Sequence, residues 1–131
     1  MNLNSSSLEF TIDDAYHGLL EVYGLLKLRG DVLVLEVREQ DGIIGIYKSS
    51  TEEHVIPLDQ IEEVTYKKKW IGARIELRAV SMSVFDAIAG SDGNILKLNI
   101  KRKNRERAES MVSTIRLRHS EMMLRKWDDQ L

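Results

Sequence analysis

The hydrophobic pattern of this chain changes its period once, and that change limits the folds that the chain can adopt. From residue 18 to residue 100, apolar residues recur at alternate positions in short runs separated by turn signals. A period of two is typical of strands with one buried face. After Asn104, a plausible N-cap, the spacing becomes helical. The residues on this helical stripe are Ala108, Met111, Val112, Ile115, His119 and Met122.

Turn residues divide the strand region into seven predicted strands. Gly30 and Asp31 form a tight turn between the first two strands, and Asp41 with Gly42 precedes the third. Pro57 lacks a backbone donor, so it should lie at a strand end or on an edge strand. The predicted strands cover residues 18–29, 32–37, 43–47, 54–58, 62–68, 73–79 and 95–100.

Three segments follow from this pattern. Residues 1–17 are expected to form an N-terminal tail with a short helical turn over residues 11–14, because Thr11 is an acceptable N-cap. Residues 18–118 are expected to form one mainly β (β+α) domain, a partly open antiparallel barrel of about seven strands capped by a C-terminal α-helix. Phe85 and its apolar neighbours predict an anchored short element between the last two strands. Residues 119–131 extend the helix.

The sequence carries no pattern typical of a catalytic or metal site. The chain has no cysteine, which excludes a disulfide scaffold, a thiolate zinc site and a cysteine nucleophile. His17, His54 and His119 are far apart, and none has a second ligand at metal-binding spacing. The adjacent carboxylates Glu62 and Glu63 would point to opposite faces of a strand. We therefore expect no enzyme, no cofactor and no metal; a small-molecule pocket at the open end of the barrel is a residual alternative.

The N-terminus and the hydropathy pattern predict where the protein resides. The first ten residues contain neither a basic region nor a long apolar run, so they do not resemble a secretory signal. No run of ~20 apolar residues predicts a transmembrane helix. We expect a soluble cytoplasmic protein, with peripheral attachment to a membrane as the alternative.

Charge is distributed unevenly along the chain. Up to Glu63 there are four basic and thirteen acidic residues, and from Val64 onward there are fifteen basic and eight acidic residues. The two parts carry −9 and +7, which together give the net charge of −2. Such asymmetry indicates an anionic partner or self-association between opposite poles, unless the two halves neutralise each other within one fold.

A first basic cluster lies at the predicted hairpin tip and consists of Lys67, Lys68, Lys69, Trp70 and Ile71. Cations for anionic headgroups beside an aromatic side chain are typical of a peripheral membrane loop. The alternative is a hairpin whose lysines protect a sheet edge and whose Trp70 packs on the barrel rim or on a neighbouring subunit.

A second basic cluster lies at the predicted start of the helix and includes Lys101, Arg102, Lys103 and Arg105. The helix dipole disfavours cations at this end, so their presence favours a role in binding phosphate or an acidic surface. Neutralisation by Glu106, Glu109 and the acidic half of the chain is the alternative. We do not expect nucleic-acid binding, because the clusters offer no aromatic platform for stacked bases.

A second apolar set on the predicted helix lies off the first stripe and consists of Leu117, Leu124 and Trp127. This set indicates that the helix extends beyond its own domain and buries a second face elsewhere. We therefore expect a homo-oligomer in which these three residues contribute to self-association.

Two stretches of the chain, "HVIPLDQIEEVTYKKKWIGARIELRA" and "ILKLNIKRKNRERAESMVSTIRL", carry a resemblance to a known family. Through them, residues 18–118 resemble bacterial pleckstrin-homology-like domains, which are related to GRAM domains. This resemblance implies a non-enzymatic interaction module of a kind that often self-assembles. Inositol-lipid binding in eukaryotic relatives uses basic residues across the first hairpin. Here Lys27, Arg29 and Arg38 are interleaved with Asp31 and Glu36, which departs from that pattern.

Two functions are predicted from these features. The first is a self-associating scaffolding module that also binds an unknown protein partner. The second is peripheral binding to anionic membrane lipid through residues 67–71, assisted by the second basic cluster.

Overall fold

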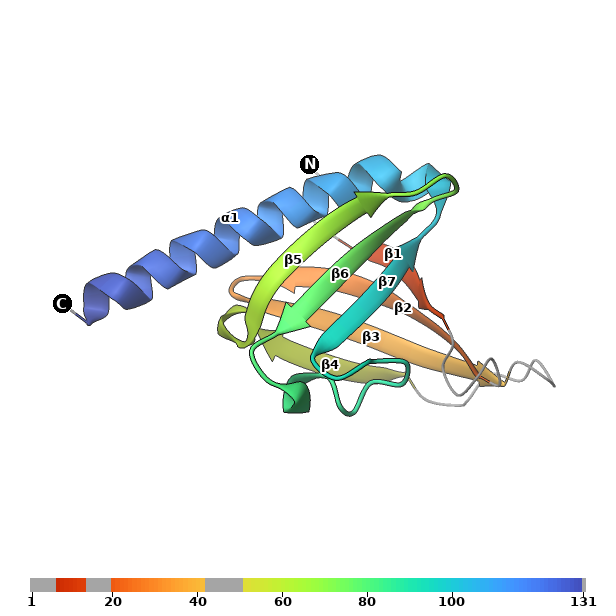
Figure 1. Ribbon diagram of the computed structural model, residues 1–131, viewed down its shortest axis with the longest axis horizontal. Coiled ribbons are helices and arrows are strands. Elements are labelled where there is room, and N and C mark those ends of the chain that lie inside the picture. The colour runs from red at the N-terminus through yellow and green to blue at the C-terminus, as the bar shows by residue number, and fades with distance from the viewer. Residues whose placement is uncertain (1–6, 14–19, 42–50, 131) are drawn as a thin grey trace.

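The computed structural model describes residues 7–13, 20–41 and 51–130. Within this part of the chain, seven antiparallel strands form one sheet and are followed by a C-terminal helix (Figure 1). The predicted mainly β fold class is therefore confirmed. The strands are β1 (Leu8–Ile12), β2 (Leu20–Arg29), β3 (Val32–Asp41), β4 (Glu52–Pro57), β5 (Ile61–Lys68), β6 (Ala73–Ala79) and β7 (Ile95–Ile100). The helical elements are the 3₁₀ turns η2 (Leu58–Gln60), η3 (Met82–Val84) and η4 (Arg102–Asn104), and the helix α1 (Arg105–Asp129).

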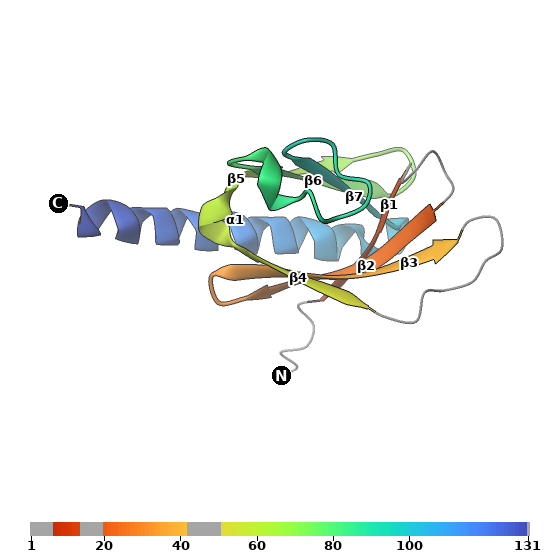
Figure 2. The same ribbon diagram turned by 90° about the horizontal axis from the view of Figure 1, so that it is seen from below.

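The strand order is β4-β3-β2-β1-β7-β6-β5, so β1 joins the two halves of the sheet. Strand β1 pairs with β2 from Leu8↔Leu26 to Ile12↔Val22 and with β7 at Thr11↔Asn99. Figure 2 shows the two halves as separate layers, with β1 crossing between them. Among the described strands, β4 and β5 end the order without a ladder between them, which leaves the barrel partly open.

The predicted alternation of side chains is clearest in β6. Ala73, Ile75, Leu77 and Ala79 are buried, while the charged residues between them are half-buried on the opposite face. A strand with this pattern presents its apolar face to the core without burying its charged side chains. The buried face of β6 meets those of the other strands, so the core lies inside the folded sheet.

Turn residues lie where the sequence predicts them. Gly30 has a φ of 57°, a left-handed conformation that glycine adopts without steric cost, and it turns β2 into β3. Pro57 is the last residue of the edge strand β4, where its missing N–H breaks no interior ladder. The strand predicted at residues 43–47 lies outside the described residues.

The N-terminal segment corrects one expectation. Leu8–Ile12 is a strand in the middle of the sheet, and Thr11 belongs to it instead of capping a helical turn. Leu8, Phe10 and Ile12 are buried. The pairing of β1 with strands on both sides, together with burial of three large side chains, outweighs the weak local preference for a helical cap.

The connection between β6 and β7 contributes to the core. Its Phe85 and Ile88 are buried, and the Ser91 hydroxyl donates a hydrogen bond to the Phe85 carbonyl at 2.9 Å. The anchored element that the sequence predicts here is thus confirmed.

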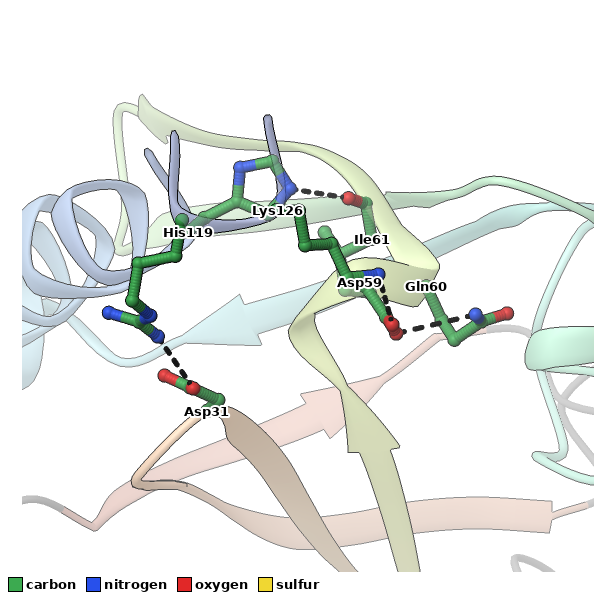
Figure 3. A network of polar contacts seen from close by, with 7 residues as sticks. Asp31, Asp59, Gln60, Ile61, His119 and Lys126 are labelled. Atoms are coloured by element: carbon green, nitrogen blue, oxygen red, sulfur yellow. Dashed lines mark hydrogen bonds and ion pairs between the residues drawn. The ribbon is translucent and has the colours of Figure 1, made fainter. Parts of the chain in front are cut away.

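Helix α1 packs its predicted apolar stripe against β5, β6 and η2. Asn104 occupies the N-cap position and is buried, although its side chain makes no capping hydrogen bond. Further along the helix, His119 Nε2 donates to the Ile61 carbonyl at 2.7 Å, and Lys126 Nζ lies 2.7 Å from Asp59 Oδ2 (Figure 3). The helix therefore stays attached to its own domain as far as Lys126.

The contact between Lys126 and Asp59 predicts a small dependence of stability on pH. Hydrogen bonds from Lys126 and Gln60 lower the pKa of the Asp59 carboxyl below its ordinary value. A carboxyl with a lowered pKa in the folded state stabilises the fold above its unfolded pKa of ~3.9, and this stability is lost as the pH falls through the folded value.

We expect Asp59→Asn to lower the free energy of unfolding at pH 7 by less than about 1 kcal/mol, because the ion pair is partly exposed. Urea unfolding of both proteins at pH 7 and pH 3 measures the effect. The difference should shrink at pH 3, and an equal difference at the two pH values would contradict this role for Asp59.

Candidate functional site

The hairpin between β5 and β6 has a turn of four residues, 69–72. The ladder ends at Lys68↔Ala73, and the Lys69 N–H donates to the Gly72 carbonyl at 3.2 Å. Gly72 has a φ of 78°, and a Cβ at this position would lie 2.3 Å from the Ile100 carbonyl oxygen. Glycine therefore allows the tip to turn while its backbone lies against the end of β7.

Trp70 and Ile71 project from this tip into solvent. Their exposed fractions are 93% and 77%. Trp70 therefore does not pack on the rim of its own barrel, and that form of the alternative interpretation is wrong. Lys67 and Lys68 are also exposed at the end of β5, and Lys69 is half-buried. Two large apolar side chains thus lie in water beside three cations.

Arg105 holds the tip in place. Its Nε donates to the Gly72 carbonyl at 2.8 Å, and its Nη2 donates to the carbonyls of Lys69 at 2.6 Å and Trp70 at 3.0 Å. A guanidinium has several donors in a fixed plane, so a single side chain can bind several carbonyls of one turn. The sequence predicts Arg105 as an anion-binding candidate; the structure adds that it positions the tip, a role that the sequence analysis missed.

The contacts of Arg105 bring together two clusters that are about thirty residues apart in the sequence. Figure 1 shows the tip of the β5–β6 hairpin beside the start of α1. Lys101, Arg102 and Lys103 are exposed at this junction. We refer to the combined surface as the basic tip, which consists of Lys67, Lys68, Lys69, Trp70, Ile71, Lys101, Arg102 and Lys103.

A shallow cleft of about 540 Å³ lies between the hairpin and the start of α1. Glu106 and Glu109 are among the residues that line it, so they offset part of the positive charge. The basic tip and Arg105 together provide seven cations against these two carboxylates. The excess positive charge can attract an anionic surface, and the exposed Trp70 can insert into its interface.

A second cleft, of about 330 Å³, lies on the outer face of the sheet near β1. Residues that line it include Thr11, Tyr23 and Asn99, which alternate along their strands with buried residues. The cleft is therefore outside the barrel, unlike the pocket at the barrel end that the sequence analysis considered. Among residues 7–13, 20–41 and 51–130, no group of three metal-binding side chains converges.

The outer face of α1 carries the second apolar set predicted from the sequence. Leu117, Leu124 and Trp127 are all exposed, on the side of the helix away from the buried Ile115 and Met122. These three side chains make no contribution to the core of their own domain.

Comparisons with protein-family models, with curated proteins and with solved structures find no match for this chain. In the part of the chain that the structure describes, no helix has both the length and the apolar character needed to cross a bilayer.

Proposed function

We propose that this protein is a non-enzymatic, pleckstrin-homology-like interaction module that docks on anionic membrane surfaces through the basic tip. One observation carries the proposal: Trp70 is 93% exposed at the end of a hairpin that carries three lysines, and Arg105 holds this end beside the cations that precede α1. A soluble domain gains nothing in its own stability from a tryptophan placed in water, whereas a bilayer interface favours this side chain.

The order of elements supports the pleckstrin-homology-like part of the proposal. Seven antiparallel strands in one bent sheet are followed by a single C-terminal helix, which agrees with the order expected of such domains.

The energetics favour reversible attachment. A Lys or Arg close to an anionic leaflet contributes ~1 kcal/mol, and this attraction falls off within the Debye length of ~10 Å at 0.1 M salt. The basic tip contains six cations besides Trp70 and Ile71, and they do not all reach the surface at once. Binding should therefore be clear at low salt and weak at high salt.

Charge, more than a specific headgroup, should determine the choice of membrane. The first hairpin, where inositol-lipid sites are found in eukaryotic relatives, offers Lys27 already paired with Glu36 at 2.7 Å. A lysine in such an ion pair is a poor ligand for phosphate. We therefore expect phosphatidylserine vesicles to bind without a requirement for inositol lipids.

Trp70 itself can report on docking. The chain has two tryptophans, so Trp127→Phe leaves Trp70 as the single indole. We expect the fluorescence emission of Trp70 to shift to the blue with phosphatidylserine vesicles at low salt, because the indole leaves water. Phosphatidylcholine vesicles should cause no shift.

The matched control is Lys67→Glu with Lys68→Glu in the same Trp127→Phe background, which should lose the shift while keeping the indole. An unchanged emission spectrum of the parent variant with phosphatidylserine vesicles at low salt would contradict membrane docking by this tip.

Contact with a protein partner is a second candidate function, and a separate observation favours it. The side chains of Leu117, Leu124 and Trp127 are between 62% and 64% exposed on one side of α1. An apolar line of this kind on a helix is stabilised when a partner covers it.

A further inference from the structure

The exposed face of α1 has the spacing of a coiled-coil seam. Ser113, Leu117, Ser120, Leu124 and Trp127 are separated by steps of four, three, four and three residues, and all five are exposed. Positions with this spacing lie along one line of a helix and are the a and d positions of a heptad repeat. The seam is polar at Ser113 and apolar from Leu117 onward, so contact should concentrate in the C-terminal half of α1.

We propose that this seam pairs with the seam of a second copy of the chain, with the two α1 helices parallel. The flanking charges support this choice of partner and orientation. Arg116 precedes Leu117 at a g position, and Glu121 follows Ser120 at an e position. In a parallel pair, a g residue lies beside the e residue five positions further along the other helix. Arg116 of each copy would then meet Glu121 of the other.

An antiparallel pair would lose this complementarity. If Leu117 of one helix faced Leu124 of the other, Glu121 would face Ser120 and lie one residue along from Glu121 of the second copy. Like charges at such positions destabilise the contact. The seam is thus complementary to itself in one orientation, as a two-fold symmetric interface requires.

Contacts within the domain hold the seam outward. Arg116 Nε donates to the Val64 carbonyl at 2.8 Å, which keeps its guanidinium on the β5 side of the seam. On the other side, Arg118 Nη1 donates to the Gly30 carbonyl at 2.7 Å, and Arg125 Nη2 lies 2.8 Å from Asp31 Oδ2. These contacts fix α1 to the sheet on both sides of the seam. The seam therefore faces solvent already, and the domain does not have to rearrange to expose it.

The size of the seam predicts weak pairing in solution. Two leucines and one tryptophan are fewer apolar residues than an interface of ~1,600 Å² contains, so the dimer should form only at high protein concentration. The parallel orientation would place both basic tips at the same end of the dimer, because each lies at the start of its α1 (Figure 1). A coupling between pairing and membrane binding rests on the proposed membrane function, because one bilayer could then bind both tips and strengthen the pairing.

Single cysteines test the pairing and its orientation, because the chain contains none. Under mild oxidation at high protein concentration, we expect both Ser120→Cys and Ser113→Cys to form disulfide-linked dimers. Position 120 lies near the centre of the seam, whereas the two residues at position 113 meet only in a parallel pair. Asp129→Cys is the control, because residue 129 is exposed on α1 but lies off the seam.

Leu124→Glu added to either seam variant should abolish cross-linking, while circular dichroism shows an unchanged fold. Glu121→Arg should weaken dimerisation by about threefold or more in sedimentation equilibrium, because it faces Arg116 with a like charge. Cross-linking at position 120 without cross-linking at 113 overturns the parallel orientation, and cross-linking at neither position overturns the pairing.

The role of the membrane is tested separately with vesicles. We expect phosphatidylserine vesicles to increase the yield of cross-linked Ser113→Cys, and Lys67→Glu with Lys68→Glu to remove this increase without changing the yield in solution. If the dimer forms in solution but vesicles do not increase the cross-linked yield, only the coupling of pairing to the membrane is overturned. Vesicle binding without cross-linking overturns the pairing and leaves the proposed membrane function intact.

Discussion

Reversing the charge of the three hairpin lysines, Lys67, Lys68 and Lys69, to glutamate is expected to lower binding to anionic vesicles by at least about 100-fold. Each lysine near an anionic leaflet contributes ~1 kcal/mol, and each 1.4 kcal/mol is a factor of ten in affinity. Loss of three such contributions already gives a factor of about 100, and repulsion by the new carboxylates adds to it. Titration with phosphatidylserine vesicles measures the affinity.

A matched variant separates the basic tip from net charge. The first double variant is Lys67→Glu with Lys68→Glu, and its control is Arg29→Glu with Lys97→Glu. Both change the net charge by the same amount, and all four residues are exposed. Only the first pair belongs to the basic tip. An equal loss of vesicle binding in both double variants would show that overall charge, and not this surface, determines attachment.

Replacing Phe85 with alanine is expected to lower the free energy of unfolding by about 3–5 kcal/mol, which is a large part of the total for a domain of this size. Phe85 is fully buried, although it lies in the connection between β6 and β7 and outside any strand. Its removal leaves a cavity in the core that the surrounding strands cannot close. Denaturant unfolding followed by circular dichroism measures the effect.

Met82→Ala is the control for that measurement, because Met82 lies in the same connection but is 68% exposed. It should change the free energy of unfolding by no more than about 0.5 kcal/mol. If the two variants were equally stable, the connection would not contribute to the core in the way that its burial indicates.

Much of the fold could be predicted from local patterns. The alternation in β6 and β7, the Gly30 turn and the switch to helical spacing after Asn104 each depend on neighbours within a few residues. Such patterns can be recognised in a sequence because burial of one face of a strand or helix determines the spacing of its apolar residues. The exposure of Leu117, Leu124 and Trp127 also follows from helical spacing alone.

Strand β1 was missed although its alternation is visible in the sequence. Leu8, Phe10 and Ile12 alternate with Glu9 and Thr11, but a preceding run of serines and the cap-like Thr11 favoured a tail. What makes this segment a strand is its pairing with β2 and β7, which are distant in the chain. Only a prediction of strand order could have supplied that information.

The assembly of the basic tip could not be predicted from the sequence for a similar reason. Each cluster is visible in the sequence, but their proximity depends on the ladder between β6 and β7, in which Ala73 pairs with Ile100. That register places the end of the hairpin beside the first residues after β7. The role of Arg105 follows from the same register, since its three acceptor carbonyls are more than thirty residues away.

The uneven charge along the chain has a spatial counterpart. Strands β2, β3 and β4, which belong to the acidic part of the sequence, form one half of the sheet, and the basic tip lies on the other half (Figure 2). Such a separation of charge would orient the molecule as it approaches an anionic surface, with the acidic half turned away.

Co-sedimentation of the unaltered protein with vesicles tests the central claim most directly. Phosphatidylserine-containing and purely phosphatidylcholine vesicles are compared at low and moderate salt. Docking through the basic tip predicts protein in the pellet with the acidic vesicles only, and release from them at moderate salt. Protein that stays in the supernatant with both kinds of vesicle at low salt would contradict the membrane function and leave contact with a protein partner as the function of this fold.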